Sequence, residues 1–142
     1  MKDKRQLGIW MDHSIAYLIE VTSDGIISKM MESESNHTEI VENLTENGHH
    51  LQQRGVNQQK IYYERLSDVI KEYDEVVLFG PGVAKNELIN ILNENHHFDK
   101  IKIEIVQKDK MTENQQVAFV KEYFKLLDVS EVGFNMYKIE NV

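Results

Sequence analysis

Residues 75–82, which read EVVLFGPG, decide how this sequence folds. Residues 76–79 are an apolar run of strand length, and Gly80-Pro81-Gly82 ends it with residues that favour a tight turn. A run without polar alternation is typical of a strand that is buried on both faces of a sheet. A helical pattern follows at once, and its inner face consists of Ala84, Leu88, Ile91 and Leu92. The stretch therefore predicts a buried strand that passes directly into a helix.

The flanking sequence predicts two further helices and one more strand. The helix before residue 75 has its apolar residues at i, i+4, i+7, i+8 and i+11, namely Tyr62, Leu66, Val69, Ile70 and Tyr73. In residues 101–105 isoleucine alternates with charged residues, which indicates a strand at a sheet edge. Thr112 and Gln115 fit a capping box that starts a third helix, with Val117, Val120, Phe124 and Leu127 on its inner face.

The N-terminal third predicts three antiparallel strands. Residues 7–11 and 15–21 are apolar runs separated by Asp12-His13-Ser14, and Asp24-Gly25 supplies a second turn before residues 26–31. These runs alternate little, so we expect helices on both faces of the sheet. The order β-β-β-α-β-α-β-α predicts an α/β fold with a mixed sheet of about five strands.

Two segments lack this periodicity. Residues 33–55 are polar, and between Lys29 and Arg54 five glutamates occur without a lysine or arginine. We expect a long loop here, either mobile and solvated or with a docking role. The tail, residues 130–142, contains several apolar residues and is expected either to add a strand or to lie against a partner.

Composition limits the classes of function. The chain of 142 residues is expected to form a single domain, residues 1–142. The absence of cysteine excludes disulfides, a thiolate nucleophile and a cysteine-based zinc site. A net charge of −8 opposes non-specific binding to phosphate backbones. No apolar run approaches the ~20 residues of a membrane span, so we expect a cytoplasmic protein without membrane contact.

The turn Gly80-Pro81-Gly82 and the nearby Lys85 form one candidate site. At a strand-to-helix junction, free backbone N–H groups and the helix dipole can receive an anion, to which Lys85 can add a charge-assisted contact. The stretch matches neither the phosphate-loop motif nor the dinucleotide-binding motif. The alternative interpretation is a tight turn that makes backbone contacts only.

The histidines and acidic residues predict neither a metal site nor a catalytic one. His49 and His50 are adjacent, as are His96 and His97, and neighbours in sequence seldom chelate one ion together. No pair of histidines has the i, i+4 spacing of a helical metal site. We expect no catalytic residue, no metal and no cofactor.

A run of amides forms the second candidate site, where the polar loop enters the helix. Amide side chains can bond RNA bases or backbone, and one arginine, one glycine and one lysine lie among them. Alternatively, Asn57 is only the N-cap of the helix and the glutamines are its solvated first turn. The candidate contact residues are Gln52, Gln53, Arg54, Gly55, Asn57, Gln58, Gln59 and Lys60.

These features together resemble the central domain of the eukaryotic and archaeal class-one release factors and Pelota, and of their bacterial relatives. The resemblance rests on the strand-turn-strand of residues 7–16, on residues 49–66, and on residues 76–82 with Lys85, and it spans residues 7–127. It implies an RNase H-like α/β fold and association with the ribosome or tRNA. In release factors the loop before the helix carries a Gly-Gly-Gln tip, whereas this chain has Gly55-Val56-Asn57 there.

The resemblance therefore implies a non-catalytic translation-associated factor, in which peptidyl-tRNA hydrolysis is not expected. A metal-dependent nuclease or hydrolase of RNase H-like fold is one alternative, and it would use Asp12 with Glu104 or Asp109. The other alternative is a protein–protein adaptor or homo-oligomer that uses the apolar tail, residues 132–139.

Overall fold

The computed structural model describes residues 4–33 and 48–140, with side chains for 4–33 and 58–129. The strands are β1 (Gln6–Met11), β2 (Ile15–Thr22), β3 (Gly25–Glu32), β4 (Glu75–Gly80) and β5 (Lys102–Gln107). The helices are α2 (Gly48–Ile70), α3 (Ala84–Asn93), the short 3-10 helix η1 (His96–Phe98) and α4 (Glu113–Glu140).

The five strands form one mixed sheet in the order β3-β2-β1-β4-β5. β1 pairs antiparallel with β2, and β2 with β3. β1 pairs parallel with β4, and β4 with β5, because helical crossovers return the chain to the same end of the sheet. Both the α/β class and the predicted edge position of β5 are confirmed.

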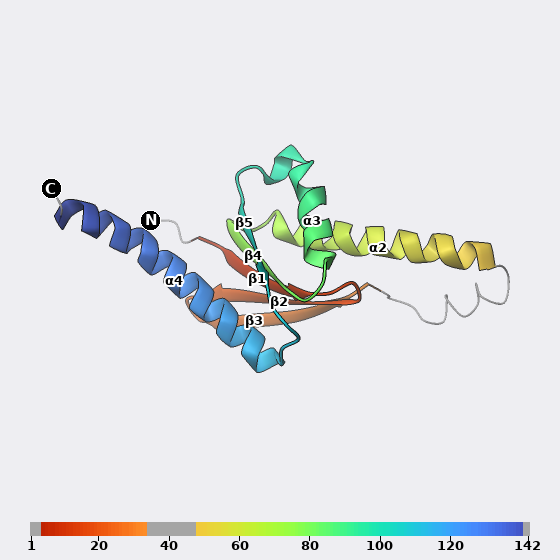
Figure 1. The fold of residues 1–142 in the computed structure, drawn as a ribbon, viewed down its shortest axis with the longest axis horizontal. Helices are drawn as coiled ribbons and strands as arrows, with labels where there is room; N and C mark the ends of the chain where they lie inside the picture. The colour runs from red at the N-terminus through yellow and green to blue at the C-terminus, as the bar shows by residue number, and fades with distance from the viewer. Residues whose placement is uncertain (1–3, 34–47, 141–142) are drawn as a thin grey trace.

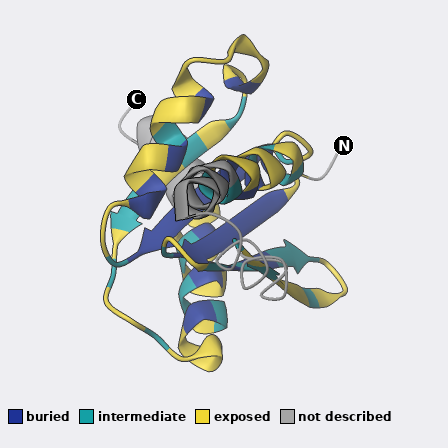
Figure 2. Cartoon of the chain, turned by 90° about the vertical axis from the view of Figure 1, so that its right-hand side faces the viewer, coloured by how far each residue is buried: buried dark blue, intermediate teal, exposed yellow. Residues whose placement is uncertain are grey.

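Helices cover both faces of the sheet, with α2 and α3 on one face and α4 on the other (Figure 1). All six residues of β1 and of β4 are buried, so both faces of these inner strands are covered. Figure 2 shows the buried residues gathered in the sheet and on the helix surfaces that face it. Gly8 lets α4 approach closely, since a Cβ there would lie 2.3 Å from a methyl carbon of Val120.

The helices leave most of β3 uncovered, and its sequence is more polar than those of the inner strands, since it contains Ser28, Lys29 and Glu32. Most of β3 is exposed, and the side chains of Ile27 and Met30 are 47% and 56% exposed. β3 lies at the edge of the sheet and pairs only with β2 within the described residues. The prediction of helices on both faces of the sheet is therefore confirmed, and β3 is the strand that they leave largely exposed.

Two predicted boundaries are wrong. Helix α2 begins at Gly48, so residues 48–55 are helical rather than part of the loop, and Asn57 is not an N-cap. The helix extends through this polar stretch because adding a residue to an existing helix costs far less than starting one. Residues 130–140 continue α4 instead of forming a strand. The remainder of the predicted loop, residues 34–47, lies outside the described residues.

Among the described residues, no helix combines the length and apolar character needed to cross a lipid bilayer.

Candidate functional site

The candidate site lies where β1 and β4 end, which we call the carboxyl edge. β1 ends at Met11, β4 ends at Gly80, and the C-terminal part of α2 passes over both strands. In open α/β sheets ligands bind outside the carboxyl ends of the parallel strands. The predicted turns at residues 12–14 and 80–82 both lie on this edge.

Asp12 organises the first turn. Its Oδ1 accepts hydrogen bonds from the backbone N–H groups of Ser14 and Ile15, each at 2.8 Å. Its backbone carbonyl accepts a hydrogen bond of 3.0 Å from the Tyr62 hydroxyl. The expected turn-forming role of Asp12 is confirmed, and the turn is tied directly to α2.

Glu87 joins three elements at this edge. Its Oε1 accepts a hydrogen bond of 2.6 Å from the Tyr63 hydroxyl of α2 and lies 3.0 Å from Nε2 of His13. The hydrogen bond from Tyr63 and the contact with His13 lower the pKa of Glu87 below its ordinary value. Burial and the neighbouring carboxylate raise the pKa of Tyr63, so its hydroxyl stays protonated as a donor.

The second turn requires glycine at residue 80. Gly80 has φ +134°, and a Cβ there would lie 2.4 Å from the backbone oxygen of Met11. This glycine therefore permits both the turn and the close approach of β1 to β4 at the edge. Gly82, with φ +70°, provides the second left-handed residue.

Lys85 is buried beneath this turn, with 1% of its surface exposed. Its Nζ donates to the Gly82 carbonyl and to the Gln107 side-chain oxygen, each at 2.7 Å. Burial lowers the pKa of Lys85, because desolvation disfavours the ammonium. The amine is thus engaged inside the protein, and the acidic Glu87 occupies the first turn of α3. These contacts favour the tight-turn interpretation of Gly80, Pro81, Gly82 and Lys85.

The second predicted site, residues 52–60, lies on α2 rather than in a loop. The side chains of Gln58 and Gln59 are partly buried, and that of Lys60 is exposed. Gln52, Gln53, Arg54, Gly55 and Asn57 are on the helical backbone, and their side chains lie outside the described ones. The two candidate sites share one end of the molecule, since α2 passes Asp12 and Glu87 at Tyr62 and Tyr63.

Sequence reasoning missed the interaction of Tyr63, Glu87 and His13. The available signal for this interaction was the pair Tyr62-Tyr63. Tyr62 belongs to the apolar face of the helix, whereas Tyr63 lies at the margin of that face. A tyrosine at such a margin buries its ring and directs its hydroxyl to a polar partner.

The described residues do not support the metal-dependent alternative. No group of three histidine, aspartate or glutamate side chains gathers among them in a way that could hold a metal ion. Asp12 is used by its own turn, and Glu104 accepts a hydrogen bond from Tyr123. Nuclease chemistry of the proposed kind requires several converging carboxylates.

Comparison with known proteins identifies the fold. No family model matches the chain. The protein pelota homolog of Nitrosopumilus maritimus is 32% identical over 44 residues, which are 31% of this chain and 13% of that protein. The crystal structure of Archaeoglobus fulgidus Pelota matches with a TM-score of 0.58 and 9% identity, over 99% of this chain and 38% of that chain.

The Thermoplasma acidophilum Pelota structure matches with a TM-score of 0.50 and 12% identity, over 78% of this chain and 30% of that chain. The chain therefore spans well under half the length of these relatives. At such identities the likeness concerns the fold, and there it confirms the resemblance expected from the sequence. The chain therefore has an α/β fold similar to that of the Pelota structures.

Proposed function

We propose that this domain is a non-catalytic, translation-associated factor that contacts the ribosome or tRNA through residues 52–60 of α2. The Pelota-like fold supports the translation assignment, and so does the short stretch of 32% identity to a Pelota homolog. A contact of this kind would take place in the cytoplasm.

The observation that carries the proposal is the length of α2. The helix has 23 residues, and Tyr62 is the first fully buried residue among those of its side chains that the structure describes, which begin at residue 58. Residues 48–61 correspond to roughly 20 Å of helix ahead of Tyr62, at ~1.5 Å per residue. Figure 1 shows this end of α2 extending beyond the sheet. A protruding helix of this kind can reach a groove that the globular body cannot enter.

The chemistry of the protruding part suits RNA better than the net charge suggests. Its cations are Arg54 and Lys60, and glutamines surround them. Amides can bond unpaired bases and riboses, and cations can approach phosphates. Local potential rather than net charge governs approach to a polyanion, so a total of −8 is compatible with such a contact. Lys85, which is buried, lies outside this proposed surface.

Cosedimentation of the purified chain with ribosomes over a salt series tests the proposal. We expect association at low salt that weakens as salt rises, because phosphate contacts release counterions. The double variant Arg54→Glu/Lys60→Glu should bind at least tenfold more weakly. The matched control Lys100→Glu/Lys125→Glu reverses two exposed charges elsewhere and should bind like the wild type. Absence of association at low salt, or equal loss in both double variants, would overturn the proposal.

A further inference from the structure

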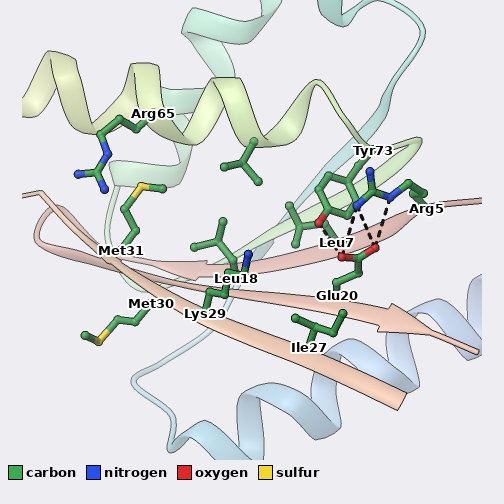
Figure 3. A pocket seen from close by; sticks show the side chains of 11 residues that line it. Arg5, Leu7, Leu18, Glu20, Ile27, Lys29, Met30, Met31, Arg65 and Tyr73 are labelled. Atoms are coloured by element: carbon green, nitrogen blue, oxygen red, sulfur yellow. Dashed lines mark hydrogen bonds and ion pairs between the residues drawn. The ribbon is translucent and has the colours of Figure 1, made fainter. Parts of the chain in front are cut away.

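An open groove runs between α2 and the edge of the sheet at β3, with a volume of about 270 Å³ (Figure 3). Arg65 and Val69 form its wall on α2, and Leu18, Ile27 and Lys29 form its floor on β2 and β3. We call it the β3 groove. Its far end is closed by Arg5, whose guanidinium is paired with Glu20 and lies 4.4 Å from the centre of the Tyr73 ring.

The part of the sheet beside α2 that no described helix covers is about as wide as one helix. α2 packs over β1, where Tyr62 and Leu66 share a core with Leu7 and Ile9. β3 lies two strands from β1, which is roughly 10 Å at the usual strand spacing of ~4.8 Å. Packed helices lie ~8–10 Å apart, so a helix placed beside α2 would lie over β3. Within the described residues, no helix occupies that position (Figure 1).

The groove combines the apolar Leu18 and Ile27 of its floor with two available cations, Lys29 and Arg65. Ile27 is 47% exposed beside the more buried Leu18. Neither Lys29 nor Arg65 has a carboxylate partner among the described side chains, and Arg65 makes only a long hydrogen bond of 3.4 Å to the Glu32 carbonyl. Arg5, by contrast, is neutralised by Glu20. A complementary partner therefore presents apolar residues with acidic residues beside them.

We propose that the β3 groove docks an amphipathic helix of a partner protein, with acidic residues along one margin of its apolar face. Such helices bind apolar grooves through anchors at i, i+3 or i+4 and i+7. The volume is below the ~300–1,000 Å³ that usually encloses a small molecule, and it suits a few anchoring side chains. The apolar Leu18 and Ile27 in the floor disfavour a phosphate backbone as the occupant. This docking does not depend on the ribosome contact of residues 52–60.

The test uses the full chain and a synthetic helical peptide of 16 residues, with leucine at i, i+3, i+4, i+7 and i+11 and glutamate beside them. A companion peptide carries lysine in place of each glutamate. In amide chemical-shift titrations, the acidic peptide should shift Ile27 and Lys29, and Lys29→Glu/Arg65→Glu should weaken its binding at least tenfold. The same double variant should bind the lysine peptide more tightly than the wild type does. Lys100→Glu/Lys125→Glu is the matched control and should behave as the wild type.

Three results would overturn the proposal. The first is peptide binding that Lys29→Glu/Arg65→Glu leaves unchanged, or that shifts amides outside the groove instead of those of Ile27 and Lys29. The second is a concentration-dependent dimer in light scattering whose formation shifts Ile27 and Lys29, which would make a second copy the occupant. The third is a shift of these amides in the free chain on Glu39→Lys/Glu42→Lys, which would assign the groove to the chain itself.

Discussion

The Tyr63 hydroxyl donates a hydrogen bond of 2.6 Å to Oε1 of Glu87, and this bond joins α2 to α3 at the carboxyl edge. The Tyr63 side chain is 5% exposed, whereas that of Glu87 is 47% exposed. A buried donor thus meets a half-exposed acceptor that also contacts His13 from the β1–β2 turn. The pair fixes the base of the protruding part of α2.

Tyr63→Phe should lower the free energy of unfolding by about 1 kcal/mol at neutral pH. The variant removes a charge-assisted hydrogen bond but keeps the buried ring, and water can solvate the carboxylate of Glu87 in its place. Urea unfolding measures the change. Tyr17→Phe is the control, because no hydrogen bond involves the Tyr17 hydroxyl among the described residues. Equal effects of the two substitutions would contradict the role assigned to Tyr63.

Stability should fall in acid partly through Glu87. The pKa of Glu87 is lowered from 4.5, first by the hydrogen bond from Tyr63, so the folded chain binds this proton less readily than the unfolded chain. Glu87 therefore contributes to the free energy of unfolding above pH 4.5, and this contribution is lost as the pH falls through the lower pKa of Glu87 in the folded chain. The stability gap between wild type and Glu87→Gln should narrow over that window. If NMR titration of the Glu87 carboxyl in the folded chain gave a midpoint at or above pH 4.5, the lowered pKa would be contradicted.

The sequence predicted those elements whose own residues decide their structure. A local signal marks three of these elements, namely the apolar run of β4, the turn after it and the helical period from Tyr62 to Tyr73. The order of the predicted strands and helices then indicated a mixed sheet. The exposure of β3 carries a weaker signal, because Ser28, Lys29 and Glu32 interrupt its apolar residues but do not show which face of the strand a helix leaves uncovered. The sequence did not show that α2 begins at Gly48, because residues 48–57 lack an apolar face and Asn57 is a good capping residue.

Gly80→Ala should destabilise the protein by at least about 3 kcal/mol. The substitution forces a left-handed backbone on alanine, which costs ~1–3 kcal/mol, and also drives its Cβ against the Met11 carbonyl. Gly25→Ala is a closely matched control: Gly25 has φ +138°, but no atom lies within 4 Å of an added Cβ. The difference between the two, measured by thermal unfolding, isolates the close approach of β1 and β4. Equal losses would show that backbone strain alone is responsible.

Gly8→Ala and Val120→Ala should compensate each other. An alanine at residue 8 meets the methyl groups of Val120 at 2.3 Å and 2.9 Å, and such overpacking costs ~1–3 kcal/mol. Val120→Ala alone leaves a cavity beneath α4 at a cost of roughly 2 kcal/mol. In the double variant the new methyl group fills part of that cavity, so the summed loss should be at least about 1 kcal/mol smaller than additivity predicts. Strict additivity in urea unfolding would contradict the contact.

The candidate site was less predictable than the fold because its contacts join residues distant in sequence. Lys85 follows a glycine-rich turn, a position where an exposed anion contact is a natural expectation. The buried amine of Lys85 instead donates a hydrogen bond to Gln107, which lies on β5 and is 22 positions away in the sequence. Tyr63 and Glu87 are similarly 24 positions apart and meet only once α2 and α3 pack on the same face.

We expect no peptidyl-tRNA hydrolysis by this chain, and the helical course of α2 adds a reason that the sequence did not provide. In the family that the chain resembles, release is attributed to a flexible Gly-Gly-Gln apex. Here Gly55-Val56-Asn57 lies within the helix Gly48–Ile70, where φ is held near about −63°. Val56 resists the conformations that a second glycine allows, and Asn57 is one methylene, roughly 1.5 Å, shorter than glutamine.

Release of formyl-methionine from loaded ribosomes should stay at the level without factor, while an active release factor serves as the positive control. Release above that level, abolished by Asn57→Ala, would show that this segment leaves the helix on the ribosome and acts catalytically.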